Sequence, residues 1–293
     1  MSTISSIIYS SFIIGTSVVI FAITQVVPEA DVVTIESNLE VFLFAQAAFA
    51  CLILLLEKPK YAPSAVEVQA AQKRNSLPFW ESVRRTLNKN YVLVLIAATL
   101  SSALMAAYQN IRNQIFTQFF LHKVSVLGTM MLVSSIFSAL SLIVFGFLFD
   151  KYKCHKSVCI ASIVALGVIN ATYYFGLVYE SIEIVFLTHV LGSIMTTGLF
   201  GLNYSAPEIN YPLPESISVT MFSIFEQVGS SLFTFTMTSI INAFGTFAVY
   251  AFMTSMFVIA IIAICCTKIE LKRTNAQVAL SKATEETEHM ENE

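Results

Sequence analysis

Eight long apolar runs constrain this sequence more than any other feature. Each run comes close to the ~20 residues that a helix needs to cross the hydrocarbon core of a bilayer. The runs are unbroken rather than alternating, which excludes a membrane-spanning β-barrel. Because lipid offers the backbone no hydrogen-bond partner, the predicted fold class is all-α and polytopic, with eight transmembrane helices. The runs lie at about 5–27, 39–56, 91–111, 126–149, 157–179, 182–204, 216–241 and 246–267.

The composition agrees with a lipid environment and excludes several classes of protein. Only 12% of the 293 residues are charged, whereas an average soluble domain carries about 25%. A surface so poor in charge does not suit a soluble enzyme or a nucleic-acid-binding protein. The five cysteines lack a paired spacing for a metal, and no Walker loop, His-Glu-x-x-His or Gly-x-Ser-x-Gly motif occurs. The sequence therefore predicts no enzyme, cofactor, metal or nucleic-acid partner, but contact with the lipid bilayer.

The placement of basic residues predicts the orientation. Cytoplasmic loops carry an excess of Lys and Arg, and 14 of the 16 basic residues fall in three regions that eight spans place on one side. These regions are the segment 57–90, the short loop 150–156 and the tail after the last run. Both termini are therefore predicted to be cytoplasmic. The exceptions are Arg112 and Lys123 in the opposite loop, where Arg112 is interpreted as an interface anchor.

The spacing of the runs predicts four parts. Residues 1–56 hold two spans and residues 57–90 form a cytoplasmic linker. Residues 91–267 hold six spans, and residues 268–293 form a cytoplasmic tail.

The end of the linker has an amphipathic pattern. Within residues 79–89, Phe79, Trp80, Val83 and Leu87 fall along one side of a helix, as in helices that lie in the headgroup region. An interfacial helix and a solvated linker both remain open as interpretations.

A distinctive loop follows the fourth run and reads Gly146-Phe-Leu-Phe-Asp150-Lys151-Tyr-Lys-Cys-His-Lys. It resembles the loop motif of the major facilitator superfamily, whose transporters have two six-helix halves joined by a long cytoplasmic loop. The resemblance implies that Gly146, Asp150 and Lys151 form a cytoplasmic gate that latches one conformation. The alternative is a basic loop after a helix end. The resemblance also implies the last two helices of the first half plus the whole second half, with four helices expected upstream.

A second motif lies between the sixth and seventh runs and reads Glu208-Ile-Asn-Tyr-Pro-Leu-Pro-Glu215. Its Glu-x-x-Tyr-Pro-x-x-Glu pattern resembles the feline leukaemia virus subgroup C receptor-related family of facilitators. That family includes haem and choline transporter relatives and the disrupted-in-renal-carcinoma protein. The stretches Glu-Lys-Pro-Lys-Tyr-Ala-Pro-Ser at 57–64 and Asn88-Lys-Asn-Tyr91 are similar to the same family.

Three prolines, Pro207, Pro212 and Pro214, predict a bent junction at this second motif, because proline does not continue a helix. The sixth span is therefore expected to end near residue 204. Glu208 is the candidate partner of the basic loop residues and completes the predicted gate. Glu215 is interpreted as a cap of the seventh helix, where a carboxylate complements the helix dipole.

Two ionisable side chains inside predicted spans are candidates for coupling. Glu226 lies about ten residues into the run 216–241, and His189 lies in the middle of the sixth run. A charge at that depth is costly and marks a functional candidate. For Glu226, carrying a proton, binding a cationic substrate and bonding to a neighbouring helix remain open. For His189, an interhelical bond and a ligand or proton-relay role remain open.

The resemblance supplies three candidate substrate-binding residues. Tyr108, followed by Gln109 near the outer end of the third span, is nearest to an aromatic of the family's cavity, which can lie over an ammonium group. Gln227 matches a glutamine that the family has in the corresponding helix.

The resulting prediction is a secondary transporter of a small organic solute that works by alternating access. The resemblance implies a choline- or ethanolamine-like cation or haem as the solute. The alternative is a truncated, non-transporting membrane protein that binds or regulates a full-length relative. The predicted location is the plasma membrane or an endolysosomal membrane, and the predicted partners are a solute, the bilayer, and a full-length relative or a second copy.

Overall fold

The part of the chain that the structure describes begins after the first two predicted spans. These spans, at 5–27 and 39–56, and nearly all of the predicted linker lie outside it. The computed structural model describes residues 78–121, 123–213, 215–276 and 278–279.

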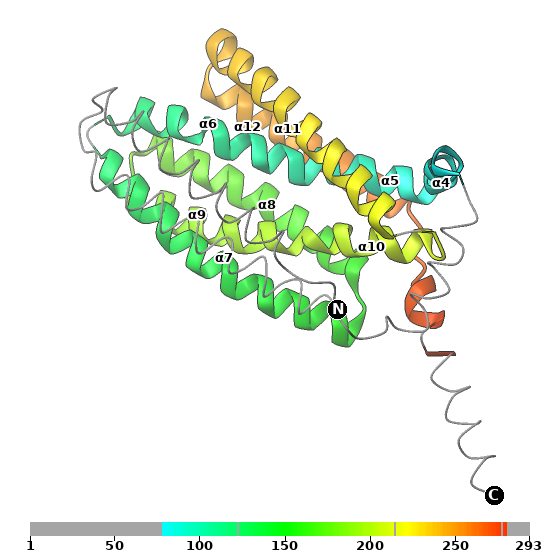
Figure 1. Cartoon of the computed structure of the whole chain (residues 1–293). Coiled ribbons are helices and arrows are strands. Elements are labelled where there is room, and N and C mark those ends of the chain that lie inside the picture. The colour runs from blue at the N-terminus through cyan, green and yellow to red at the C-terminus, as the bar shows by residue number, and fades with distance from the viewer. Residues whose placement is uncertain (1–77, 122, 214, 277, 280–293) are drawn as a thin grey trace, which may run out of the picture.

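The described residues form helices joined by short connections, and none of them forms a strand (Figure 1). A short π-helical stretch, η1, joins α5 to α6 without a break, and α10 follows α9 almost directly. The elements are α4 (Phe79–Thr86), α5 (Lys89–Ala98), η1 (Thr99–Ala103), α6 (Leu104–Phe119), α7 (Val124–Tyr152), α8 (His155–Val178), α9 (Ile182–Gly198), α10 (Phe200–Asn210), α11 (Glu215–Phe244) and α12 (Thr246–Cys265).

The all-α polytopic class is confirmed, although the count of eight spans is not. Among the described residues, five helical segments are long and apolar enough to cross a membrane. The predicted run 216–241 falls on α11, a 30-residue helix that is not among the five. Its sequence includes Glu226, Gln227 and many serines and threonines, which lower its hydropathy. The five segments are Lys89–Phe119, Val126–Tyr152, His155–Val178, Ile182–Asn210 and Thr246–Cys265.

The prediction that the sixth span ends near residue 204 is wrong. The helix continues through α10 to Asn210, and Pro207 lies inside it. Proline removes one backbone hydrogen bond and crowds the preceding turn. Inside a bundle, neighbouring helices can hold such a segment helical, and α10 packs against α5, α8 and α11.

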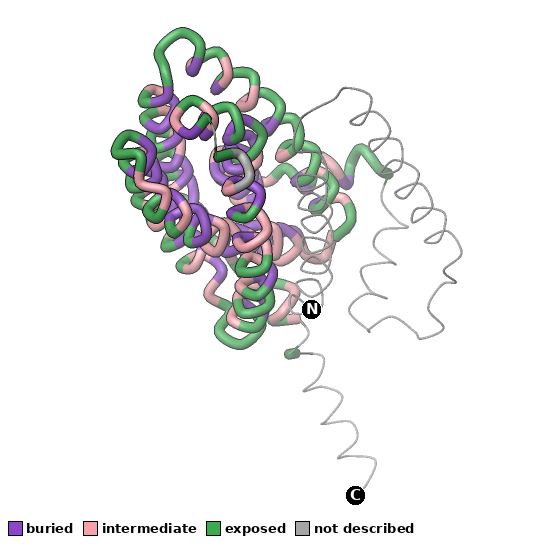
Figure 2. The backbone as a smooth tube through the Cα atoms, turned by 90° about the vertical axis from the view of Figure 1, so that its left-hand side faces the viewer, coloured by how far each residue is buried: buried purple, intermediate pink, exposed green. Residues whose placement is uncertain are grey.

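The helices pack in two connected groups (Figure 1). In one, α9 lies between α7 and α8; in the other, α11 packs on α6 and α12 packs on α5. Contact between α8 and α12 joins the groups. Figure 2 shows buried stretches turned inward and exposed stretches along the outside of the bundle.

The outer surface of the bundle is apolar, which agrees with the low content of charged residues. Phe235 on α11 is 77% exposed and Leu232 is 64% exposed. A soluble protein rarely exposes large apolar patches, whereas hydrocarbon is the natural neighbour of such side chains. Further exposed apolar residues on α7 and α8 are Phe137, Leu140, Val144, Phe147, Val164 and Val168.

The helix α4 occurs where the amphipathic pattern predicts a helix. Phe79 and Trp80 are exposed side by side, with ring centroids 5.4 Å apart, whereas Ser82 and Thr86 face inward and are buried. Its location at the headgroups stays a prediction.

A close approach between α8 and α10 depends on Gly201. A Cβ atom at this position would lie 2.8 Å from Cys159 Sγ and 2.9 Å from Phe149 Cζ, and both side chains are fully buried. Small residues permit such close helix packing in membranes.

We therefore expect Gly201→Ala to lower the free energy of unfolding by about 1–3 kcal/mol, because overpacking moves buried side chains. Thermal unfolding of the purified chain in detergent, followed by circular dichroism, measures the effect. Gly167→Ala is the matched control, because no atom lies within 4 Å of its added methyl group. Equal stability of the two variants would contradict the predicted close contact.

Candidate functional site

A cavity of about 390 Å³ lies among the long helices. This volume falls in the range of small-molecule sites. Side chains from η1, α6, α7, α8 and α9 line most of it, α10 contributes Phe200 and Asn203, and α11 contributes Glu226. The lining combines hydroxyl groups and tyrosine rings with a few charged or ionisable side chains.

The helical period explains how the sequence builds this lining. On α6 the lining residues Met105, Tyr108, Gln109 and Arg112 share one face, because residues three and four apart lie together on a helix, and Ala106 lines the cavity beside them. The same spacing recurs on α7, where Met131, Ser134, Ser135 and Ser138 line the cavity. On α9 the lining residues are Thr188, His189, Gly192, Ser193, Thr196 and Thr197.

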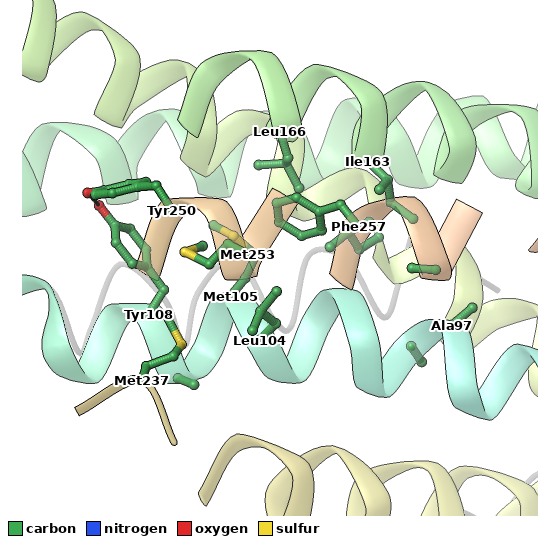
Figure 3. Packing of buried hydrophobic residues seen from close by; sticks show 14 of the residues in the cluster. Ala97, Leu104, Met105, Tyr108, Ile163, Leu166, Met237, Tyr250, Met253 and Phe257 are labelled. Atoms are coloured by element: carbon green, nitrogen blue, oxygen red, sulfur yellow. Dashed lines mark hydrogen bonds between the residues drawn. The ribbon is translucent and has the colours of Figure 1, made fainter. Parts of the chain in front are cut away.

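Tyrosines form an aromatic wall beside the cavity: Tyr108 and Tyr173 line it, and Tyr250 packs against both. The hydroxyl groups of Tyr108 and Tyr250 lie 3.0 Å apart, so α6 and α12 meet there (Figure 3). Tyr173 on α8 lies edge-on to Tyr108 with ring centroids 6.2 Å apart. Aromatic faces of this kind attract cations, and the wall extends the predicted role of Tyr108.

Arg112 is buried rather than placed in an outer loop, so the interpretation of it as an interface anchor is wrong. The helix continues to Phe119 and turns Arg112 inward, where only 7% of its surface remains exposed. Its Nη1 atom lies 3.1 Å from Nε2 and 3.4 Å from Nδ1 of His189. His189 therefore makes an interhelical contact between α6 and α9, and its predicted coupling role stays a prediction.

Glu226 lines the same cavity from α11. No other residue in the described ranges donates a hydrogen bond to its carboxylate or forms an ion pair with it. Its predicted role in coupling stays a prediction.

Gln227 follows directly and is exposed, away from the cavity lining. Successive residues on a helix point about 100° apart, so two neighbours do not face the same cavity equally. Its predicted role in substrate binding stays a prediction, whereas Tyr108 and Gln109 both line the cavity.

Two buried donors on the cavity wall have no partner among the described residues. They are Nδ2 of Asn170 and the hydroxyl group of Tyr173, one helical turn apart on α8. Buried polar groups are normally hydrogen-bonded, which makes these two atoms notable on the cavity wall. Reasoning from the sequence missed Asn170, Tyr173 and Tyr250, although their spacing on α8 and the aromatic content of α12 are visible there.

A second polar site lies at the predicted cytoplasmic end and contains the predicted gate. Glu208 accepts hydrogen bonds from the backbone N–H of Thr274, at 3.1 Å, and from its hydroxyl group, at 2.7 Å. Glu215 forms an ion pair with Arg273 at 2.6 Å. The two carboxylates thus hold the segment after α12.

The expected pairing of Glu208 with the basic loop is not what forms in the described residues. Lys151 instead lies over the rings of Phe147 and Tyr152, 5.7 and 5.3 Å from their centroids. Asp150 and Glu208 both act electrostatically on His155, which begins α8. Gly146 lies on α7, one turn before Asp150. The gating role of all four stays a prediction.

Two of the stretches that resemble the family, Asn88–Tyr91 and Glu208–Glu215, are joined directly. Asn88 donates to Oδ1 of Asn210 at 2.7 Å, and Asn210 donates to the Ser218 hydroxyl group at 3.0 Å. The Tyr91 hydroxyl group donates to the Ser218 carbonyl at 2.6 Å. This network, named here the junction network, ties the start of α5 to the end of α10 and the start of α11.

The fold and the cavity define a polytopic α-helical membrane protein built around a small-molecule-sized polar site. No protein-family model matches the chain. It is 24% identical over 224 residues, or 75% of its length, to an uncharacterised MFS-type transporter of Caenorhabditis elegans. It is 27% identical over 198 residues, or 67% of its length, to the choline/ethanolamine transporter FLVCR2 of Homo sapiens. The FLVCR2 protein of Rattus norvegicus is 26% identical over 201 residues.

These similarities confirm the resemblance to the major facilitator superfamily and to its FLVCR-like members. The matched region spans only 38% of the C. elegans and human proteins and 36% of the rat protein.

Tyr91→Phe tests the junction network. We expect a loss of about 1 kcal/mol in the free energy of unfolding, because a buried carbonyl loses its side-chain donor. Thermal unfolding in detergent measures it. Tyr179→Phe is the control, because Tyr179 is 75% exposed, and the same loss in both variants would speak against the network.

Glu208→Ala tests the hydrogen bonds between Glu208 and Thr274 in the segment after α12. We expect the Thr274 amide to exchange its hydrogen about tenfold faster, because a charged acceptor contributes roughly 1.5–3 kcal/mol. Hydrogen exchange with mass spectrometry on the segment 268–276 measures it. Glu270→Ala removes an exposed carboxylate from the same segment and should leave the rate unchanged; unchanged exchange in Glu208→Ala would contradict the predicted contact.

Proposed function

We propose that this chain is part or all of a secondary transporter that moves a small ammonium-bearing solute across a membrane by alternating access. The observation that carries the proposal is the polar and aromatic cavity of about 390 Å³ inside a bundle with an apolar outer surface. The similarity to FLVCR2, a choline/ethanolamine transporter, supports an ammonium group as the recognised feature.

The chemistry of the cavity suits such a solute. The rings of Tyr108 and Tyr173 offer aromatic faces to a cation. Glu226 supplies a carboxylate on the lining of the cavity. Its free oxygens can either neutralise the solute or carry a proton. Haem has weaker support, because Nε2 of His189, its candidate ligand atom, lies 3.1 Å from Arg112.

The contacts at the predicted cytoplasmic end suit a gate. Alternating access needs contacts that form in one conformation and break in the other. The pairs Glu208–Thr274 and Glu215–Arg273 lie between α10, α11 and the segment after α12, where a small shift separates them.

Uptake of radiolabelled choline into proteoliposomes that contain the purified chain tests the proposal. We expect uptake above that of empty liposomes, and an about tenfold reduction in Glu226→Gln, which removes both the charge and the proton; a tenfold change corresponds to about 1.4 kcal/mol. Glu270→Gln, which changes an exposed carboxylate, is the matched control and should retain full uptake.

The same experiment separates the alternative function. Absence of uptake by the unmodified chain, together with its capture of a full-length FLVCR-like protein from co-expressing membranes, would favour a regulatory membrane protein. Equal uptake by the Glu226→Gln and Glu270→Gln variants would remove Glu226 from the mechanism.

A further inference from the structure

The cavity contains a buried positive charge that the described residues do not neutralise. Arg112 is 7% exposed and its guanidinium group contacts His189, but it forms no ion pair with a carboxylate in the described part of the chain. A neutral imidazole does not balance a cation, and a protonated one would repel it. Glu226 lines the same cavity but is not paired with Arg112.

An unbalanced guanidinium in a membrane interior is costly and points to a functional partner. A carboxylate is the natural one, because the planar fork of N–H donors matches its two oxygens. His189 holds the guanidinium from the side of α9 and so fixes its direction. The free donors of Arg112 are left for another group.

Two further donors lie on the wall of the same cavity. Asn170 is 4% exposed and Tyr173 is 3% exposed, and Nδ2 of the first and the hydroxyl group of the second lack a partner among the described residues. A carboxylate accepts several hydrogen bonds at once. Arg112, Asn170 and Tyr173, which also belongs to the aromatic wall, thus form a set of donors, named here the donor cluster, to which the described residues supply no carboxylate.

The donor cluster lies beside the aromatic wall. Tyr108 precedes Arg112 by four residues on α6, about one helical turn or ~5.4 Å along the axis. A solute whose ammonium and carboxylate groups are separated by one carbon can therefore reach both features.

We propose that the solute is a zwitterion, with its ammonium group at the tyrosine wall and Glu226 and its carboxylate at the donor cluster. This inference rests on the proposed function for the ammonium group and adds the second charge. It makes Arg112 the residue that separates carboxylate-bearing solutes from plain ammonium alcohols.

Glycine betaine and choline are a matched pair of probes, because they share the trimethylammonium group and differ in a carboxylate against a hydroxymethyl group. Competition binding with radiolabelled betaine on the purified full chain in detergent gives both affinities. We expect betaine to bind at least about tenfold more tightly than choline, because its carboxylate forms a charge-assisted hydrogen bond with Arg112. Equal or tighter binding of choline, or binding of neither probe, would overturn the proposal.

Three variants locate the preference. Arg112→Gln should abolish it, and Tyr173→Phe should reduce the ratio of the two affinities about threefold, because only the free hydroxyl group is lost. Tyr173→Phe keeps the ring and its packing against Tyr108 and Tyr250, so it tests the proposal even if Arg112→Gln fails to fold. Tyr174→Phe is the matched control and should keep the ratio. An unchanged ratio in Tyr173→Phe would contradict the donor cluster.

Binding and transport failures are distinguishable. Choline uptake without a preference for betaine overturns the zwitterion and leaves the transporter in place. Betaine binding that depends on Arg112, without uptake of either solute, supports the donor cluster and contradicts the transport proposal.

Discussion

Lipid gives a polar group no hydrogen-bond partner, so each such group in the bundle has to find one inside the protein. Most hydroxyl groups in the long helices do so locally. Ser101, Ser205 and Thr238, for example, each donate to the carbonyl four residues earlier. Local bonds of this kind form within one helix and need no neighbouring helix. They leave a few buried polar atoms without a partner among the described residues. Those of Asn170 and Tyr173 line the cavity, whereas that of His155 lies at the start of α8.

The helices that line the cavity also reach the junction network and the gate. On α10, Asn203 lines the cavity and Asn210 lies two turns further on, in the junction network. On α11, Ser218 belongs to the network and Glu226 lies two turns further on, at the cavity. A shift of either helix at the predicted cytoplasmic end therefore moves a lining residue, which is the physical link that alternating access requires.

Several features were predictable because they depend on local patterns. Continuous apolar runs predicted the long helices between residues 89 and 265. The basic loops lie at a shared end of the bundle, where Lys156 donates to the carbonyl groups of Cys265 and Thr267. Tyr108, Gln109, His189 and Glu226, chosen separately, line one cavity. The burial of Arg112 was not predictable, because hydropathy alone ended the third span before it. The position of Pro207 inside a helix was not predictable either, because the packing of α10 overrides the local preference of proline to end a helix.

The sequence alone determined that the chain consists of membrane-crossing helices, because composition and run length decide whether backbone and side chains prefer lipid to water. It also identified the family resemblance through short motifs. Only the tertiary structure decided which polar side chains meet, because residues 77 positions apart, such as Arg112 and His189, come together through helix packing that no local pattern encodes. The same packing leaves Asn170 and Tyr173 with free donors beside Arg112 and thereby turns separate polar positions into one site.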